Sequence, residues 1–500
     1  MSIYDELMKR FERGKDGKLK FRMFAGAKGG RLTNDWAAGG TSQDSELFTS
    51  LAALRNRSRQ MIRDNPHAAN LQRIVIDNVV GTGIGLQAQV TKRDGSPDQS
   101  VNDQIEEAWQ RWCEKDTCHT AGQLGMTELL RMAIGGVFQD GEAIIRKVRR
   151  PFGQGRIPFA LEVIEPDLLL DHGVGTYMGQ AGNTIRFGVE VDQWQRPVAY
   201  WMRRFHPGDF AYAGEIHREA MRRIPAKDIE HLHLVSRWPQ TRGVPWMHMV
   251  IRRLRDMGGY TESELTAARA AANIMGFVQQ SLDTLDPSDF DKLKKVDRFI
   301  KSEPGTFQRL LPGETFNGFA PSRPNAQLDG FMRYMLREVA SGVGVSYESL
   351  SRDYSQSNYS SSRLALLDDR NQWRVLQSWL IRNYLHDIYR EWLDAAVISG
   401  AVRIPDYFNR KEHYQKVRFK PRGWSWVDPQ KEVQAYVLAV QHGFMSRSDV
   451  IAAIGNGQDR EDVDKMIKSD RERAKALGLD FDTETIKEQS TGNGETETGE

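Results

Sequence analysis

The spacing of the apolar residues changes twice along this chain of 500 residues, and these changes restrict its possible folds more than any other feature. Apolar residues recur at helical spacing in residues 51–81, 101–113 and 124–138. From residue 142 to about residue 240, short apolar or alternating runs lie between proline and glycine clusters, which predicts β-strands. Helical spacing returns after Pro245. The sequence therefore predicts an α+β protein built from several regions.

The first helical pattern also predicts its own boundaries. Asn65-Pro66 interrupts the pattern in 51–81, and since the residue before a proline disfavours helical geometry, we expect two helices. The glycines at 81, 83 and 85 are expected to end the second helix. Residues 1–50 are rich in Gly, Lys and Arg, which predicts a flexible basic arm.

The longest predicted helix runs from Pro245 to Phe277. Proline suits the first position of a helix, and alanines are dense between Ala267 and Ala272. At 1.5 Å per residue such a helix would reach roughly 50 Å. The pair Gly258-Gly259 lies inside it, and each glycine disfavours a helix by about 1 kcal/mol relative to alanine. A straight helix and a kinked one both remain open.

A polar segment separates the next two helical patterns, residues 328–339 and 361–392. This segment, residues 351–362, contains no aliphatic side chain, so it suits neither a buried strand nor a buried helix. We expect it to face solvent or a water-filled channel, with an ordinary surface loop as the alternative. Residues 430–478 are expected to be helical, and the acidic tail after them is expected to be disordered.

The composition excludes several classes of protein. The chain has 69 Lys and Arg against 67 Asp and Glu, a balance unlike that of proteins that grip duplex DNA through many phosphate contacts. No apolar run approaches the roughly 20 residues of a membrane span, and the N-terminus lacks the apolar core of a secretion signal. Two cysteines are too few for a disulfide framework, which favours a reducing compartment.

Motifs for nucleotide binding and hydrolysis are missing. There is no G-x-x-x-x-G-K-[ST], so ATP-driven work would belong to a partner, and no G-x-S-x-G surrounds a serine. Gly81-Thr-Gly-Ile-Gly85 lacks the dinucleotide spacing and is interpreted as a turn. Cys113, Cys118 and His119 are spaced more widely than most zinc ligands and have no clear fourth partner, so we interpret the cysteines as structural.

Two further groups of residues could bind a metal. His231 and His233 would lie on one face of a strand, but no carboxylate triad accompanies them, and a solvent-facing strand edge is the simpler interpretation. Clustered carboxylates hold metal in nucleases, but here a turn context favours a surface role. These carboxylates are Glu162, Glu165, Asp167 and Asp171. We therefore expect no catalytic residue, no metal and no cofactor, and we do not expect an enzyme.

A series of motifs between residues 50 and 430 resembles, in the same order, the lambda-type portal proteins of tailed bacteriophages. The motifs are Arg55-Asn-Arg-Ser-Arg59, Asn65-Pro66, Asn78-Val-Val-Gly-Thr-Gly83, Ile164-Glu-Pro-Asp167, Gly188-Val-Glu190, Arg196-Pro-Val-Ala-Tyr200, Arg242-Gly-Val-Pro-Trp246, Leu310-Leu-Pro-Gly-Glu314, Arg323-Pro-Asn325, Gly344-Val-Ser-Tyr347 with Leu350, Asn358-Tyr-Ser-Ser361 and Trp426-Val-Asp-Pro429. The Gly258-Gly259 pair departs from the pattern expected of the family's stem helix.

The resemblance implies a closed ring, usually of twelve subunits, with wing, stem, clip and crown regions around an axial channel. The implied regions are a flexible arm at 1–50, the wing at 51–244, a stem helix at 245–279, the clip at 280–312, a wing return with a channel-side helix at 313–349, the channel loop at 350–362, a helical crown-proximal region at 363–429, crown helices at 430–478 and a disordered tail at 479–500.

The resemblance also implies roles for three groups of residues. In the channel loop, Tyr354, Gln356, Asn358 and Tyr359 would approach DNA. In the clip, Lys292, Lys294, Lys295, Arg298 and Lys301 form a basic cluster where terminase and connector proteins would dock, unless they are a solvated helix face. On the stem, the small side chains of Ala267, Ala268 and Ala271 would let neighbouring subunits approach, unless they pack within one chain.

The implied function is a gate through which DNA is packaged and ejected at one vertex of a phage capsid. The implied partners are other copies of the chain, double-stranded DNA held without sequence specificity, the large terminase subunit, a head–tail connector, and the major capsid and scaffold proteins. We expect no membrane, assembly in the host cytoplasm and a final place in the virion. A different virion connector and a metal-dependent nuclease built on Glu162–Asp171 are the alternatives.

Overall fold

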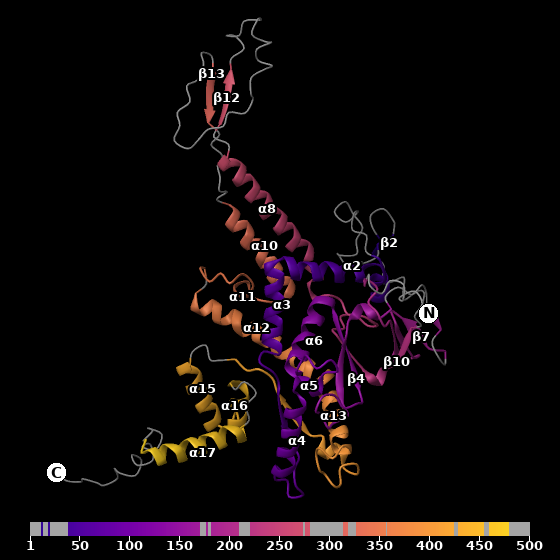
Figure 1. Cartoon of the computed structure of the whole chain (residues 1–500). Helices are drawn as coiled ribbons and strands as arrows, with labels where there is room; N and C mark the ends of the chain where they lie inside the picture. Colours follow the sequence, from indigo (N-terminus) through magenta and orange to yellow (C-terminus); the bar gives the residue numbers. More distant parts are fainter. Residues whose placement is uncertain are drawn as a thin grey trace, which may run out of the picture.

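Figure 1 shows a computed structural model of the whole chain, in which a helical body carries a projecting pair of helices. The structure describes residues 12–13, 19–20, 39–170, 177–178, 182–209, 221–273, 276–280, 314–318, 327–356, 358–424, 429–454 and 460–479. In the N-terminal arm, β1 (Glu12–Arg13) pairs antiparallel with β2 (Leu19–Lys20).

The body is built around helices that pack on a small antiparallel sheet. Its helices are α2 (Gln43–Asp64), α3 (Pro66–Val79), α4 (Gln99–Trp112), α5 (Lys115–Cys118) and α6 (Met126–Asp140). The sheet has the order β11 (Ile229–His233), β4 (Glu142–Val148) and β5 (Ala160–Ile164). Asn65 accepts hydrogen bonds from the first amides of α3, with Pro66 at its first position, which confirms the expected break. The arm is shorter than expected, because α2 begins at Gln43.

A second antiparallel sheet packs against the first through a smaller apolar cluster, which includes Ile144 and Ile164 of the first sheet and Val189 and Tyr200 of the second. Its strands run in the order β10 (Arg222–Pro225), β9 (Pro197–Met202), β8 (Val189–Val191), β7 (Thr184–Arg186) and β6 (Tyr177–Met178). Two short 3-10 helices, η2 (Pro166–Leu168) and η5 (Ala226–Asp228), lead out of β5 and into β11. The sequence predicted five strands in this region, at residues 142–148, 159–164, 185–191, 198–202 and 229–235. Strands β4, β5, β9 and β11 lie at four of these positions, and β4 has the predicted bounds. The run 185–191 instead forms two antiparallel strands, β7 and β8, and β6 and β10 were not predicted.

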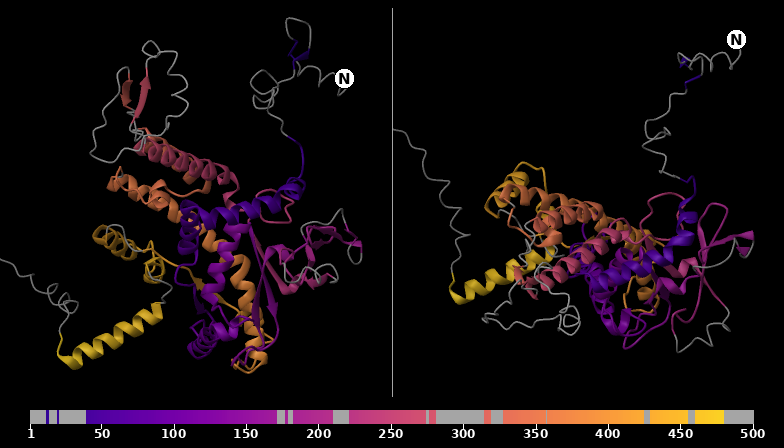
Figure 2. Two further views of the ribbon diagram at one scale, coloured as in Figure 1. Left: turned by 45° about the horizontal axis from the view of Figure 1, so that its top comes forward. Right: turned by 90° about the horizontal axis from the view of Figure 1, so that it is seen from above.

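Two helices project together from the body (Figures 1 and 2). After η6 (Trp246–Met249), α8 (Ile251–Asn273) leads outward to β12 (Gly276–Gln280), and β13 (Glu314–Gly318) precedes α10 (Leu328–Val343). Arg253 pairs with Glu338 at 3.1 Å, while Tyr260 contacts Phe331 at 5.1 Å between ring centres, so the two helices run antiparallel. The helix predicted at 245–277 was too long, because it ends at Asn273 and Phe277 lies in β12. Helix α8 continues through Gly258-Gly259.

The chain then re-enters the body through α11 (Tyr347–Ser351), α12 (Tyr359–Leu380), a π-helical turn η9 (Ile381–Leu385) and α13 (His386–Ile398). Trp392 of α13 lies edge-on to Trp109 of α4 at 4.9 Å in the main core. After α14 (Lys411–Tyr414), β14 (Val417–Lys420) pairs with β3 (Gly85–Ala88). The expected C-terminal helices are α15 (Pro429–Gln441), α16 (Arg447–Ile454) and α17 (Arg460–Leu477). Within the described residues, no helix combines the length and apolarity of a membrane span.

Candidate functional site

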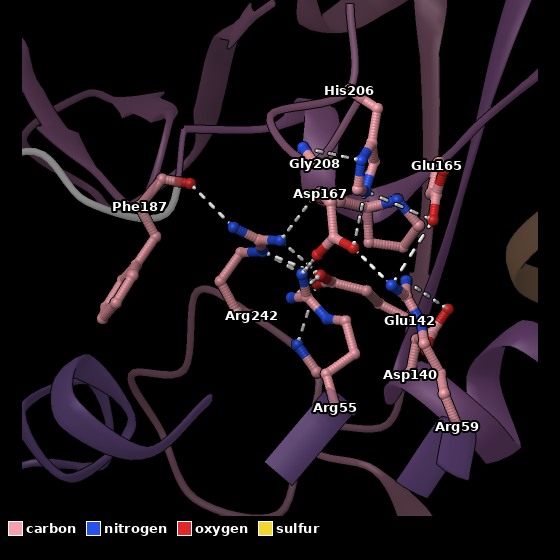
Figure 3. A network of polar contacts seen from close by, with 12 residues as sticks. Arg55, Arg59, Asp140, Glu142, Glu165, Asp167, Phe187, His206, Gly208 and Arg242 are labelled. Carbon is pink, nitrogen blue, oxygen red and sulfur yellow. Dashed lines mark hydrogen bonds and ion pairs between the residues drawn. The ribbon is translucent and has the colours of Figure 1, made fainter. Parts of the chain in front are cut away.

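A buried carboxylate, Glu142, joins several distant segments of the chain (Figure 3). It lies at the start of β4, and its side chain is fully buried. Arg242 donates from Nε to both carboxylate oxygens at 2.9 Å, and Arg55 of α2 donates from Nη2 to Oε1 at 3.1 Å. The amide of Gly243 donates to Oε2 at 3.1 Å, and His231 Nε2 lies 2.9 Å from the same oxygen. Two fully buried guanidinium groups therefore share one buried anion.

The same network continues across α2 to the start of the second sheet. Arg55 and Arg59, one helical turn apart, both donate to Asp167 of η2. Arg59 also donates from Nε to Asp140 Oδ1 at 2.7 Å at the end of α6. Arg242 completes the connection, because it donates to the carbonyl oxygens of Pro166 at 3.2 Å and Phe187 at 3.1 Å. These contacts fasten the two sheets, α2 and the segment that leads into α8 to one another.

Two glycines allow the backbones to approach at this network. Gly141 has φ +88°, a left-handed conformation, and a Cβ there would lie 2.4 Å from the Val244 carbonyl carbon. A Cβ on Gly243 would lie 2.0 Å from the Gly141 carbonyl oxygen. Any larger residue would separate Glu142 from Arg242, which explains why glycine follows Arg242 in the motif at 242–246.

The charges of the network hold its acids in the ionised form. Burial by itself would raise the pKa of Glu142, but Arg242, with the hydrogen bonds from His231 and Arg242, holds it well below its usual range. Burial opposes ionisation of Asp167 as well, and Arg55 and Arg59 outweigh it and lower its pKa to about 2. Removal of one partner from a buried ion pair strongly destabilises a protein. We therefore interpret this network as a structural joint between the segments that it connects.

The carboxylates that could have supported a nuclease are engaged by arginines. Glu165, Asp167 and His206 lie close enough together to hold a cation. However, Arg59 Nη1 contacts Asp167 and lies 3.4 Å from Glu165, and Asp167 also accepts from Arg55. Glu162 pairs with Arg146 at 3.2 Å on the surface, and Asp171 lies outside the described residues. The guanidinium of Arg59 therefore already pairs with both carboxylates of this cluster.

The two histidines of β11 are half-buried, and the side chain of His231 is turned inward onto Glu142, so the expectation of a solvent-facing strand edge was wrong for His231. Although β11 is the edge strand of its sheet, the side chain of His231 is 5% exposed and contacts Glu142. The ring of His233 lies tilted against it, with 4.5 Å between ring centres. Burial, followed by the neighbouring His231, lowers the pKa of His233 to about 4. These imidazoles belong to the structural joint.

The two cysteines are free thiols in the body. Burial raises the pKa of Cys113, and burial raises that of Cys118 to about 12. His119 Nδ1 accepts from the amides of Gln123 and Leu124, both at 3.3 Å, so that this nitrogen caps a turn. This geometry supports the structural interpretation of Cys113, Cys118 and His119.

A second joint fastens the end of α3 to α12 and to the segment that follows β14. Trp424 Nε1 donates to Asn78 Oδ1 at 3.0 Å, and Gln377 of α12 donates to the Asn78 carbonyl at 3.0 Å. Gly81 has φ +60°, and a Cβ there would lie 2.6 Å from Cδ of Arg422. Arg131 donates to the Gly81 carbonyl at 2.9 Å. Gly81 therefore lets these chain segments approach closely. This agrees with the interpretation of residues 81–85 as a turn.

The predicted channel loop is shorter in the structure than in the sequence prediction. Residues 350–362 were expected to be a loop, but Ser351 ends α11 and Tyr359 begins α12, which leaves residues 352–358 between the helices. Asn358 and Ser361 form a reciprocal capping box, with Asn358 Oδ1 accepting from the Ser361 amide at 2.8 Å. Tyr354 is 58% exposed, and Gln356 and Asn358 are also exposed. For Tyr359 only its place at the start of α12 is described.

The other predicted site residues are only partly described. Ala267 and Ala268 are half-buried on α8, and the side chain of Ala271 lies outside the described residues. The predicted clip cluster also lies outside the described residues; it comprises Lys292, Lys294, Lys295, Arg298 and Lys301. The acid–arginine joint at Glu142 was not predicted as a site, although three of its arginines stand in motifs of the sequence. Its one local signal is an acid at the first position of the apolar run 142–148.

Comparison with known proteins gives one consistent family. A family of phage portal proteins, the lambda family, matches residues 29–377. A protein described as a probable portal protein from Halomonas phage phiHAP-1 is 30% identical over 92% of this chain and 88% of its own length. Portal protein B of Escherichia phage lambda is 21% identical over 93% of both chains. A chain from the neck of an empty GTA particle is similar with a TM-score of 0.46 and 16% identity, over 83% of this chain and 95% of that one. On the family match and the 30% identical relative, this chain belongs to the lambda family of phage portal proteins.

Proposed function

We propose that this chain assembles into a closed ring that lines the DNA channel at one vertex of a phage-type capsid. Family membership over most of the chain is the observation that carries this proposal. It makes the chain a phage portal protein, a structural component of the virion, and DNA packaging and ejection through the portal follow from the family. The finer parts of the proposal concern the ring, the regions of the subunit and its partners.

Apolar side chains that a single chain leaves exposed support self-assembly. On the projecting pair, Leu265 of α8 is 50% exposed and Tyr334 of α10 is 66% exposed. On α12, Leu364 and Val375 are 71% and 67% exposed. Exposed apolar side chains on several elements favour burial against another surface, and identical subunits that pair head to tail close into a ring at a fixed angle. We expect twelve copies.

In this proposal the two sheets and the helices of the body form the wing, and α8 with α10 forms the stem. The hairpin β12–β13 with the residues between its strands belongs to the clip, and the loop 352–358 faces the channel. Helices α15, α16 and α17 form the crown. The loop offers neutral polar groups on Tyr354, Gln356 and Asn358, which exchange hydrogen bonds readily and would let duplex DNA slide without sequence preference. The small side chains on α8 lie where neighbouring stems would meet.

The proposed partners follow from the same assignment. The clip, with its predicted lysine and arginine cluster, would receive the large terminase subunit during packaging and the head–tail connector afterwards. The wing would face the major capsid and scaffold proteins while the particle assembles in the host cytoplasm. A separate virion connector is the weaker alternative, because the family match runs through the projecting helices and the loop between residues 245 and 377.

Mass photometry of the full-length protein at low and moderate salt tests the ring directly. A discrete species at twelve times 57.0 kDa, or at one subunit more or fewer, would support the proposal. A monomer or dimer at every concentration would contradict it. In that case a metal-dependent cleavage assay with an Asp167→Asn variant would test the nuclease alternative.

A further inference from the structure

The loop 352–358 contains one acidic residue, Asp353, and its carboxylate is turned toward the helices. Tyr347 of α11 donates its hydroxyl to Asp353 Oδ2 at 2.9 Å. The amide of Ser355 donates to Oδ1 at 3.0 Å, and Arg333 Nε of α10 lies 3.7 Å from Oδ2. Both oxygens of the carboxylate are therefore engaged on the inner side of the loop.

The backbone at this position needs such a contact. Arg352 ends α11 with φ +59°, a left-handed conformation that is uncommon for a residue other than glycine. The amide of Asp353 then donates to Ser351 Oγ at 3.1 Å. A conformation of this kind persists where the surrounding contacts enforce it, and here the contacts converge on Asp353.

The contacts of Asp353 connect the loop to α10 in particular. Arg333 is itself oriented by Asp329, one turn earlier on α10, at 3.0 Å. The ring of Tyr347 lies under the guanidinium of Arg337, also on α10, at 5.3 Å. At the other side of α11, Ser346 and Ser349 donate to Asp369 of α12 at 2.7 and 3.0 Å. Asp369 thus fastens α11 to α12, while Asp353 fastens the loop to α11 and α10.

We propose that Asp353 is a positioning residue that couples the channel loop to the stem helix α10 and keeps the loop's one carboxylate turned away from the channel. This inference rests on the proposed function, because it takes the loop to face DNA. A carboxylate released into the channel would repeat in every subunit and repel the phosphates of the passing duplex. The hydrogen bonds from Ser355, with that from Tyr347, also lower the pKa of Asp353 to about 2, in agreement with the engagement of both carboxylate oxygens.

Hydrogen exchange of the full-length assembled protein, followed by mass spectrometry of the peptide containing Tyr354 and Ser355, tests the coupling. Tyr347→Phe removes one hydrogen bond to the carboxylate and retains the ring, so we expect exchange about tenfold faster. Asp353→Ala removes every contact of the side chain and should give a larger increase. Arg333→Gln lies about twenty residues before the loop, yet it should accelerate exchange by about threefold if α10 holds the loop.

Arg253→Gln is the matched control. It removes Arg253 of α8 from its ion pair with Glu338 of α10. This pair lies on the side of α10 that faces α8. We expect no change in loop exchange from it. Equal acceleration by Arg253→Gln and Arg333→Gln, or none from Arg333→Gln and Tyr347→Phe, would overturn the coupling. Mass photometry of the same samples reports the ring separately, so failure of the ring and failure of the coupling are distinguishable.

Discussion

Replacement of Glu142 by glutamine tests whether the buried acid–arginine network holds the body together. The change keeps the shape of the side chain and removes its charge. Arg55 would retain Asp167, whereas Arg242, which is fully buried, would lose the charged carboxylate that accepts from both its Nε and its Nη2. Removing the charge of one partner from a buried ion pair destabilises a protein by about 3 to 5 kcal/mol. A domain's whole free energy of unfolding is only about 5 to 15 kcal/mol, so the loss is large.

Differential scanning fluorimetry of the purified chain measures this effect. For a folding unit of about 150 to 250 residues, each kcal/mol lowers the midpoint by about 2 to 4 °C, so we expect the midpoint of the first unfolding transition to fall by about 6 to 20 °C. Glu162→Gln is the control, because Glu162 pairs with Arg146 where both side chains are 40% exposed, and such a pair contributes about 1 kcal/mol or less. If Glu142→Gln and Glu162→Gln gave the same small shift, the buried network would not carry the stability assigned to it.

Four further predictions concern charge, packing and the loop. The pKa of Asp167 is lowered to about 2 in the folded protein, so its ionised form stabilises the fold by about 2 kcal/mol above pH 4. This stabilisation is lost as the pH falls from about 4 to 2, and Asp167→Asn should remove this part of an acid unfolding curve. Gly243→Ala should destabilise the body severely in urea unfolding, whereas Gly330→Ala, in an open helical position, should be neutral or stabilising by up to about 1 kcal/mol. Asn358→Ala should lose about 1 kcal/mol of capping, seen as faster amide exchange at the first turn of α12 only. Tyr354→Ala with Gln356→Ala should leave the mass of the ring unchanged and alter the rate of DNA packaging; a smaller assembly would show that the loop serves assembly instead.

Local signals in the sequence predicted the types of the elements well. The expected strand 142–148 is β4, and the break at Asn65-Pro66 separates α2 from α3, because alternation, proline and capping residues act within a few positions. The errors in the predicted boundaries also came from local composition. The first turn of α12 was assigned to the loop because it contains no aliphatic side chain, although Asn358 and Ser361 form a capping box that the sequence already contained. The end of α8 was placed too late because Ala-rich sequence continues up to it.

The family could also be inferred from the sequence, because its motifs keep their order along the chain. The roles of the motifs that contain Arg55, Asp167 and Arg242 became visible only in the tertiary structure. Arg55, Glu142, Asp167 and Arg242 come from four separate segments, and no periodicity relates them. A carboxylate can be buried only where opposite charges reach it, and that condition depends on distances in space. The sequence by itself therefore determined the helices, most of the strands and the family, whereas the tertiary structure decided which charges meet and fasten the two sheets to the segment that leads into α8.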